Sequence, residues 1–422
     1  MKILCVNKFF HVRGGADRYF FETIAALEAR GHEVVHFSSA HPRNRPSPYA
    51  AYFSPLGGAE DDLPDMSLTR RARMFANGVY SFAAARLLAR LVADTRPDVA
   101  HVHNILYQLS PSVVGALRRL RVPVVQSLHD WHIVCGGAYL YTHDGICERC
   151  RGGRFYNCAR YKCYRESRAA SAMATANKYV DSVLNLWQGG VQAYTVPSEH
   201  MAARLARWGL PRERLHVIRN PFSLNGLKPT YATNDHVLWY GRLIRLKGIY
   251  TLLEAARRRP HVHFELYGDG PEAAAVRAFI ADHELDNVLL DTETRWGPEL
   301  QARIANATCV VDPSEWHHPS QYVWWETAAL GTAMIATRMG SSPDVIADGE
   351  NGLLFDSGEV SQLCAQIDYL YADRDAAKRL GRAARATVET LVAEQPFVER
   401  LEWIYDRALQ ARQNGYRDES AI

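Results

Sequence analysis

The sequence predicts an α/β chain made of two domains, each a parallel sheet with helices on both faces. At 422 residues the chain is too long for one ordinary hydrophobic core. Short apolar, β-branched runs alternate with helical stretches in both halves, a pattern typical of strands covered on both faces. The two halves are separated by a segment near 220–235 that is rich in Asn, Pro, Gly and Thr and has no periodicity.

The first domain is predicted over residues 1–222. A strand at the N-terminus leads through a glycine-bearing loop to a helix over about 17–30. Further strands are expected at HEVVHFS, PDVAHVHN, VPVVQSLHD, QAYTVPS and HVIRNPF. Ligands of such sheets bind at the carboxyl ends of the strands, where four polar side chains fall: His103, Asn104, His129 and Asp130.

The second domain is predicted over residues 223–395. Its strands are expected at HVLWYGRL, VHFELYGDG, NVLLD, CVVDPS and AMIATRMG, with helices such as KGIYTLLEAARR between them. The chain ends in a helical segment, and we expect the helix over about 396–422 to pack back on the first domain.

Composition and charge exclude several classes of protein. The net charge of +3 gives no case for nucleic-acid binding, and no run of 18 apolar residues predicts a membrane-spanning helix. The apolar stretch at the N-terminus is short and interrupted by Asn7 and Lys8, so it is interpreted as a strand rather than a signal peptide. A cytoplasmic protein is therefore expected.

Residues 70–92 have the pattern of one basic, amphipathic helix. Such a helix could rest on an anionic bilayer surface, which would make the protein peripheral on the inner face of the membrane. The solvated face of an ordinary domain helix explains the pattern equally well, and the sequence leaves both interpretations open.

Five of the eight cysteines fall between residues 135 and 163. Cys147 and Cys150 have the spacing of zinc ligands, and Cys158 and Cys163 could complete a tetrahedral set, although their spacing is loose for zinc. A structural zinc ion would hold a loop and do no chemistry. The alternative is a loop with buried free cysteines.

The strongest local motif is YGRLIRLKG at 240–248, which follows a strand and opens a helix. Loop amides and a helix N-terminus favour an anion there. Arg242 offers a planar fork of donors and Lys247 a compact charge, together suited to a diphosphate. Since the chain has only seven lysines, Lys247 beside the helix-opening glycine is unusual. The alternative is two solvated cations at a helix start.

Three weaker motifs surround this one. Gly14 and Gly15 follow the first strand and would let a phosphate approach the backbone, although a simple turn explains them as well. Glu326 is predicted near the start of a helix, where its carboxylate could accept both hydroxyls of a ribose or could complement the helix dipole. Gly268 and Gly270 in GDGP would form a backbone wall near a nucleobase, or a turn.

The order of the motifs resembles one known family. Gly14-Gly15, HVHN, SLHD, NPF, GRLxxxKG, YGDGP, PSEW…E…GT and DGxNGLLF occur as they do in retaining family-four glycosyltransferases, nearly from end to end. That family has the GT-B fold, in which two Rossmann-like domains face each other across a donor-binding cleft. The region 101–165 is similar to a subgroup associated with bacterial surface polysaccharide assembly.

The resemblance implies a role for each matched residue. Gly14 and Gly15 would meet the donor phosphate, Arg242 and Lys247 would bind the diphosphate and stabilise the leaving charge, and Glu326 would hold the ribose. His129 would lie beside the transferring sugar, so the implied catalytic residues are His129, Arg242 and Lys247. The other implied donor contacts are Gly268, Gly270 and His318. The implied acceptor-side residues are His103, Asn104 and Asp130.

The sequence departs from the family at two places. The family usually has two glutamates seven residues apart, and counting back from Glu326 places His318 at the first of them. Glu315 lies three residues too early, so the sugar contact would be made differently, by His318 or Glu315. The second departure is SSPD at 341–344, where the family often has Gly-Gly or Gly-Ile before Pro-Glu.

The sequence thus predicts a retaining, metal-independent glycosyltransferase that takes a nucleoside-diphosphate sugar as donor. The acceptor would be a glycan or a polyprenyl-linked sugar in exopolysaccharide, capsule or O-antigen synthesis. Two alternatives remain open: a sugar-nucleotide epimerase or hydrolase on the same fold, and a non-catalytic nucleotide-sugar-binding subunit, which His318 favours.

Overall fold

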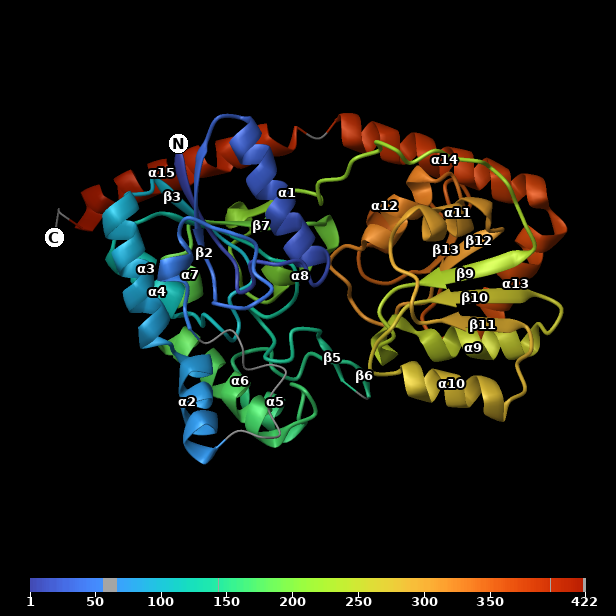
Figure 1. Cartoon of the computed structure of the whole chain (residues 1–422), viewed down its shortest axis with the longest axis horizontal. Coiled ribbons are helices and arrows are strands. Elements are labelled where there is room, and N and C mark those ends of the chain that lie inside the picture. Colours follow the sequence, from blue (N-terminus) through green and yellow to red (C-terminus); the bar gives the residue numbers. More distant parts are fainter. Residues whose placement is uncertain (56–66, 143, 395, 420–422) are drawn as a thin grey trace. The chain divides into compact units, whose positions relative to one another are not determined.

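The computed structural model describes residues 1–55, 67–142, 144–394 and 396–419 (Figure 1). Contacts divide the chain into two compact units. Unit 1 comprises Met1–Thr142, Cys147–Pro221 and Pro396–Ile422, and unit 2 comprises His143–Ile146 and Phe222–Gln395.

Unit 1 is built on a six-stranded parallel sheet with the order β2-β1-β3-β4-β7-β8. Its strands are short and buried because helices cover both faces. Between β1 and β3 the order reverses, which makes this the topological switch point of the sheet. The strand bounds are β1 (Lys2–Val6), β2 (Glu33–Phe37), β3 (Val99–Val102), β4 (Val124–Ser127), β7 (Ala193–Val196) and β8 (Leu215–Val217), and a separate hairpin pairs β5 (Tyr141–Thr142) with β6 (Gly145–Ile146).

The C-terminal helix α15 (Phe397–Glu419) packs on unit 1, where it contacts β3, β4 and α1 (Gly15–Ala29). Its apolar residues recur with helical spacing and enter the same buried cluster as Ile3, Phe20 and Val125. These residues are Leu401, Ile404, Tyr405 and Ala408.

Residues 70–92 do not form the single helix that the sequence predicts. The structure has two helices, α2 (Leu68–Val79) and α3 (Phe82–Thr95), separated at Tyr80 and Ser81. The break has a local cause: the Ser81 hydroxyl caps α3 by accepting a hydrogen bond from the Ala84 amide at 3.2 Å. The Ser81 amide is held in turn by the Ser110 hydroxyl at 2.8 Å. The other helices of unit 1 are α4 (Ser112–Arg119), α5 (Tyr156–Arg160), α6 (Arg168–Val183), α7 (Leu186–Gly190) and α8 (Glu199–Arg207).

Unit 2 repeats this architecture with the order β11-β10-β9-β12-β13-β14, again parallel. Successive residues of β9 (His236–Tyr240) alternate between two cores, Val237 and Trp239 on one face and Leu238 and Tyr240 on the other. The switch point lies between β9 and β12. The other strands are β10 (His263–Tyr267), β11 (Val288–Asp291), β12 (Cys309–Asp312), β13 (Ala333–Thr337) and β14 (Leu353–Phe355).

Helices cover both faces of the second sheet. They are α9 (Ile249–Arg258), α10 (Ala273–Asp282), α11 (Pro298–Asn306), α12 (Tyr322–Ala329), α13 (Val360–Ala372) and α14 (Arg374–Ala393). Within the described ranges, every helix is too short or too polar to span a bilayer. The predicted α/β class, with two Rossmann-like halves, is confirmed.

Candidate functional site

The loop that carries Arg242 leaves β9 at the switch point of the second sheet. It is held by backbone hydrogen bonds to the neighbouring loop: the Gly241 amide donates to the Tyr267 carbonyl at 3.0 Å, and the Leu243 amide donates to the Asp269 carbonyl at 2.9 Å. The Arg242 side chain is exposed, and within the described chain its guanidinium has no hydrogen bond or ion pair. The loop therefore presents a fixed backbone with an available cation.

Gly268 and Gly270 are required by this contact between loops. A Cβ at Gly268 would lie 1.8 Å from the Gly241 oxygen, and a Cβ at Gly270 would lie 2.4 Å from the Leu243 oxygen. Gly268 also has a φ of +156°, which side chains disfavour. Both glycines thus fix the path of the Arg242 loop.

Lys247 ends a short 3-10 turn directly before helix α9. Its ammonium group donates to the Gln321 side-chain oxygen, and the Gln321 amide donates to Asp312 at the end of β12. Burial lowers the pKa of Lys247, and the negative charge of Asp312 opposes this shift. Gly248 has a φ of +67°, and a Cβ there would lie 1.8 Å from the Pro313 oxygen. The lysine is thus held across the switch point, at the N-terminus of α9.

Glu326 is buried in the second turn of α12, further from the helix start than the sequence suggests. The Tyr240 hydroxyl donates to its carboxylate at 3.2 Å. The Tyr240 ring stacks on Trp296 with 6.3 Å between centroids and 25° between planes. Trp296 is 38% exposed, so an aromatic face is available near Glu326. Neither aromatic residue was predicted from the sequence as part of the site, although Tyr240 begins the motif that contains Arg242.

His318 is buried between the two serines of the SSPD segment. Its Nε2 lies 3.2 Å from the Ser342 hydroxyl, and its Nδ1 lies 3.2 Å from the Ser341 hydroxyl. Glu315 accepts a hydrogen bond from the Thr251 hydroxyl at 2.9 Å. His318 and the SSPD segment, the two departures from the family pattern, are therefore in contact. The Ser341 and Ser342 hydroxyls each lie within hydrogen-bond distance of one ring nitrogen of His318.

At the switch point of the first sheet, side chains tie the ends of β1 and β3 to helix α1. The Asn104 amide donates to the Asn7 side-chain oxygen at 3.2 Å, and the Asn7 side-chain amide donates to Asp17 at 3.0 Å. Asp17 also accepts from the Arg13 amide at 3.1 Å, just before the Gly14–Gly15 segment. Gly14 is extended and Gly15 begins α1. Asn7 and Asp17 were not among the residues that the sequence singled out.

His103 and His129 follow neighbouring strands and lie together. Their rings are stacked at 5.6 Å, and His103 Nδ1 lies 3.3 Å from His129 Nε2. Tyr19 packs its ring edge against His129 at 4.7 Å. Burial lowers the pKa of His129 to about 4 and that of His103 well below its usual range, so both rings are neutral at pH 7.

Asp130 is engaged by the imidazole of His132, with 2.6 Å between Oδ1 and Nδ1. Burial acts to raise the pKa of Asp130, but the charge and hydrogen bonds of His132 outweigh it and lower the pKa to about 2. Among the acceptor-side candidates, Asp130 is therefore ionised over the whole physiological range.

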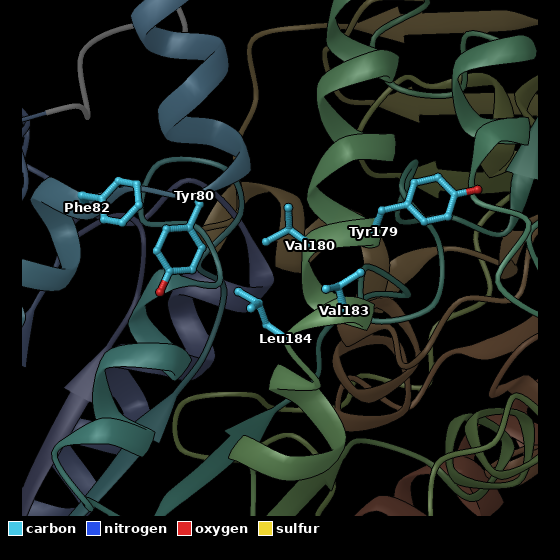
Figure 2. Close-up of a pocket in the computed structure, with 6 residues that line it drawn as sticks. All are labelled: Tyr80, Phe82, Tyr179, Val180, Val183 and Leu184. Atoms are coloured by element: carbon cyan, nitrogen blue, oxygen red, sulfur yellow. The ribbon is translucent and has the colours of Figure 1, made fainter.

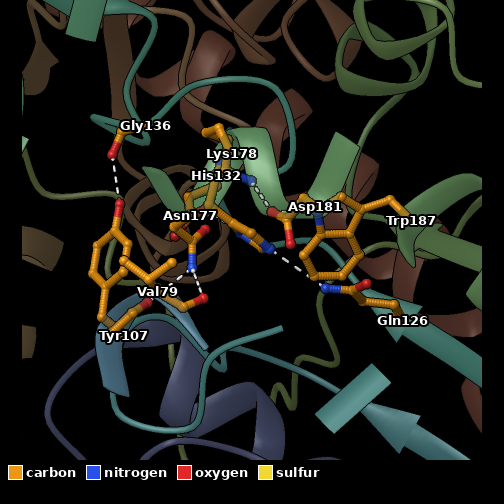
Figure 3. Close-up of polar contacts among 11 residues, drawn as sticks. Val79, Tyr107, Gln126, His132, Gly136, Asn177, Lys178, Asp181 and Trp187 are labelled. Atoms are coloured by element: carbon orange, nitrogen blue, oxygen red, sulfur yellow. Dashed lines mark hydrogen bonds and ion pairs between the residues drawn. The ribbon is translucent and has the colours of Figure 1, made fainter. Parts of the chain in front are cut away.

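Buried polar contacts join helix α6 to α7, and the segment after β3 to the segment after β4 (Figure 3). Lys178 donates to Asp181 at 2.8 Å, and the Trp187 indole donates to the same carboxylate at 2.8 Å. Nearby, the Tyr107 hydroxyl donates to the Gly136 carbonyl at 2.8 Å. The buried pair of Lys178 and Asp181 holds its segment in place because separating the two would leave an uncompensated charge in an apolar environment.

The zinc site considered for Cys147, Cys150, Cys158 and Cys163 is not found. All eight cysteines are free thiols, and no three His, Cys, Asp or Glu side chains of the described chain gather as around a metal ion. Cys150 and Cys158 instead pack into a small apolar cluster with Ala174. Burial raises the pKa of Cys150 to about 12.

Each unit thus collects its candidates at the carboxyl ends of its own strands. Unit 1 carries Gly14, Gly15, His103, Asn104, His129 and Asp130, and unit 2 carries Arg242, Lys247, Gly268, Gly270, His318 and Glu326. Two doubly wound sheets, with Arg242 and Lys247 at the switch point of the second, are typical of an enzyme that binds a nucleotide ligand.

Two family models match the chain in succession. A "Glycosyl transferase 4-like domain" matches residues 14–221, and "Glycosyl transferases group 1" matches residues 228–387. The chain is a glycosyltransferase of the retaining, family-four type with the GT-B fold.

Known proteins agree with this assignment. The D-inositol 3-phosphate glycosyltransferase of Pseudarthrobacter chlorophenolicus is 29% identical over 395 residues, which cover 88% of this chain and 85% of that protein. The lipopolysaccharide core biosynthesis glycosyltransferase LpsE of Rhizobium meliloti is 31% identical over 165 residues, or 39% of this chain and 47% of that protein. The structure of Anabaena HepE in complex with UDP and glucose has the same fold, with a TM-score of 0.62 at 18% identity over 95% and 99% of the two chains.

Proposed function

We propose that this enzyme transfers a sugar from a nucleoside-diphosphate sugar to a glycan or lipid-linked acceptor, with retention, in the assembly of a bacterial surface polysaccharide. The polysaccharide would be an exopolysaccharide, a capsule or an O-antigen. The observation that carries the donor assignment is the switch point of the second sheet, where Arg242, Lys247 and the N-terminus of α9 lie at the end of β9.

On the donor side, Arg242 and Lys247 would bind the diphosphate. The exposed Arg242 guanidinium offers a fork of donors to phosphate oxygens, and the Lys247 ammonium would exchange its bond to Gln321 for one to the ligand. Helix α9 adds the positive end of its dipole. These groups stabilise charge that develops on the departing diphosphate, so no divalent metal is required.

The ribose and base would be held by neighbouring groups of unit 2. Glu326 has a carboxylate fixed by the Tyr240 hydroxyl, which suits bidentate acceptance of two ribose hydroxyls. Trp296 offers a partly exposed aromatic face against which a base could stack.

On the reacting side, His129 is proposed to contact the transferring sugar. A neutral imidazole can both donate and accept a hydrogen bond, and the low pKa of His129 keeps it neutral. In a front-side reaction the leaving phosphate oxygen takes the proton of the acceptor hydroxyl, so no separate base is needed.

The surface-polysaccharide assignment rests on similarity. LpsE is named for lipopolysaccharide core biosynthesis, whereas the relative that aligns over most of this chain is named for an inositol phosphate. We favour the glycan or lipid-linked acceptor because the chain also has an exposed apolar groove near the basic helix α3.

A non-catalytic nucleotide-sugar-binding subunit is the second candidate. It is favoured by one observation: His318 stands where the family has a sugar-contacting glutamate, and its nitrogens are engaged by Ser341 and Ser342. This candidate requires nucleotide binding without turnover of any donor.

The donor site is tested by thermal melting with UDP, GDP and dTDP, with and without EDTA. A nucleotide at 100 times its dissociation constant stabilises the native state by about 2.7 kcal/mol. We expect one nucleotide to raise the melting temperature regardless of EDTA and to lose this effect in Arg242→Ala. Arg277→Ala, an exposed arginine on α10 of the same unit, is the matched control. Stabilisation that persists in Arg242→Ala would remove the phosphate assignment.

A further inference from the structure

An apolar groove lies between the α2–α3 turn and the C-terminal end of α6 (Figure 2). Its volume is about 510 Å³. Two aromatic residues of the turn form one wall, and the end of α6 forms the other. The lining residues are Tyr80, Phe82, Tyr179, Val180, Val183 and Leu184.

The groove exposes large side chains that ordinarily avoid water. Phe82 is 77% exposed and Val183 is 82% exposed, each at an end of its helix. A contiguous exposed apolar surface of this kind usually marks a place where a partner or a membrane binds.

Both walls are fixed by buried hydrogen bonds. The Ser81 hydroxyl caps α3 and the Ser81 amide donates to the Ser110 hydroxyl, which sets the position of Phe82 at the first turn of the helix. The Asn177 side chain of α6 donates to the Gly78 carbonyl at the end of α2 at 2.9 Å. The groove is therefore a built surface between three helices.

Arginines lie on two of the helices near the groove, α3 and α4. Arg86 and Arg90 follow Phe82 at intervals of four residues, so they lie along the same exposed side of α3. Arg118 donates to the Leu184 carbonyl at 3.3 Å, which brings its guanidinium beside the other wall. The sequence from 67 to 93, which contains α2 and most of α3, has no acidic residue.

The opposite wall is formed by α6, in which the one acidic residue is Asp181. Asp181 on α6 is buried and is neutralised by Lys178. Between Phe82 and Arg90 the charged side chains of α3 are cationic, and Asp94 lies beyond them near the end of the helix.

We infer that this groove docks the enzyme on an anionic bilayer surface, with Phe82 and Val183 entering the boundary between headgroups and acyl chains and the arginines binding the headgroups. Apolar side chains beside a basic face have the chemistry of an interfacial membrane anchor. A second copy of the chain is disfavoured because a symmetric contact would bring the arginines of α3 against themselves. Docking requires neither donor nor acceptor, so it does not rest on the proposed function.

The test is co-sedimentation with phosphatidylcholine vesicles that contain either no anionic lipid or 30 mol% phosphatidylglycerol, without any polyprenyl phosphate. We expect the wild type to bind the anionic vesicles. Phe82→Ser with Val183→Ser, and separately Arg86→Gln with Arg90→Gln, should each weaken binding about tenfold or more, as expected for an exposed anchor. Salt should weaken wild-type binding because the headgroup contacts are ionic.

Matched controls come from unit 2. Tyr369→Ser removes an exposed aromatic residue, and Arg277→Gln with Arg379→Gln removes two exposed charges; both should bind as the wild type does. Melting curves with the stabilising nucleotide show whether each variant is folded and keeps its donor site. Absent wild-type binding, or equal binding by the groove variants, overturns the inference. A concentration-dependent dimer that Phe82→Ser abolishes, without vesicle binding, would assign the groove to a second copy instead.

Discussion

At the scale of single residues, Lys178 and Asp181 form a pair whose members are both almost completely buried. The carboxylate accepts hydrogen bonds from the Lys178 ammonium and from the Trp187 indole. The value of such a pair for stability depends on both members, because removing one leaves a charge in an apolar environment.

We therefore expect Lys178→Met to lower the free energy of unfolding by about 3–5 kcal/mol, the usual cost of breaking a buried pair. Lys178→Met combined with Asp181→Leu should recover much of this loss, since it removes both charges. Urea denaturation followed by tryptophan fluorescence measures both variants. Equal stability of Lys178→Met and the wild type would show that the pair contributes nothing.

His318 offers a second prediction at this scale. Replacement by alanine leaves the Ser341 and Ser342 hydroxyls without their ring partner in a buried place. We expect His318→Ala to cost about 1–3 kcal/mol of stability, as for other unsatisfied buried polar groups. Nucleotide stabilisation should survive, since the diphosphate groups are unchanged. Loss of nucleotide binding in a folded His318→Ala protein would instead give the histidine a direct ligand contact.

At the scale of elements, the loops after β9 and β10 act as one structure. Gly268→Ala would force a Cβ to within 1.8 Å of the Gly241 oxygen, so the Arg242 loop must move. We expect this variant to lose nucleotide-dependent stabilisation as measured by thermal melting.

Gly297→Ala is the matched control for Gly268→Ala. Gly297 precedes α11 in the same unit, and a Cβ there meets only the Arg295 oxygen, at 3.8 Å. It should leave the nucleotide response intact. If Gly268→Ala responds to nucleotide as Gly297→Ala does, the two loops do not form the donor site.

The elements themselves were largely predictable. Buried strands such as PDVAHVHN are continuous apolar runs that end in polar residues, and the structure has β3 there with His103 and Asn104 directly after it. The single helix over 70–92 was wrong because helical periodicity does not reveal the Ser81 cap that restarts the chain as α3.

Within the candidate site, the sequence could supply motif residues but not their partners. Arg242 and Lys247 stand in a recognisable motif. The role of Asn7 and Asp17 depends on hydrogen bonds between segments that are distant in the sequence, which the sequence alone does not reveal. Trp296 was missed for the same reason, since its stacking on Tyr240 depends on the order of strands.

At the scale of the whole molecule, acid should destabilise the protein through buried histidines. Burial lowers the pKa of His36, His129 and His200 to about 4 and that of His101 to about 3, from an ordinary value of 6.5. The unfolded chain binds protons at these residues at a higher pH than the folded chain does.

Above about pH 6.5 these histidines are neutral in both the folded and the unfolded chain, and the full stability is present. As the pH falls from 6.5 toward 4, the unfolded chain binds protons that the folded chain does not, so the free energy of unfolding decreases. We expect the melting temperature to drop steadily between pH 7 and pH 4.5, as measured by calorimetry in buffers of constant ionic strength. A melting temperature that stays constant over this range would contradict neutral, buried histidines.

The proposed activity is sugar transfer from a nucleotide donor held by Arg242 and its neighbours. It is tested most directly by incubating the enzyme, in EDTA, with a panel of nucleoside-diphosphate sugars and bacterial lipid-linked glycan extract, and by measuring released nucleoside diphosphate. We expect acceptor-dependent release from one donor, a loss of about 10²–10³ in rate for Arg242→Ala, and wild-type rates for Arg277→Ala. Equal rates for Arg242→Ala and the wild type, or nucleotide binding with no release from any donor, would contradict it.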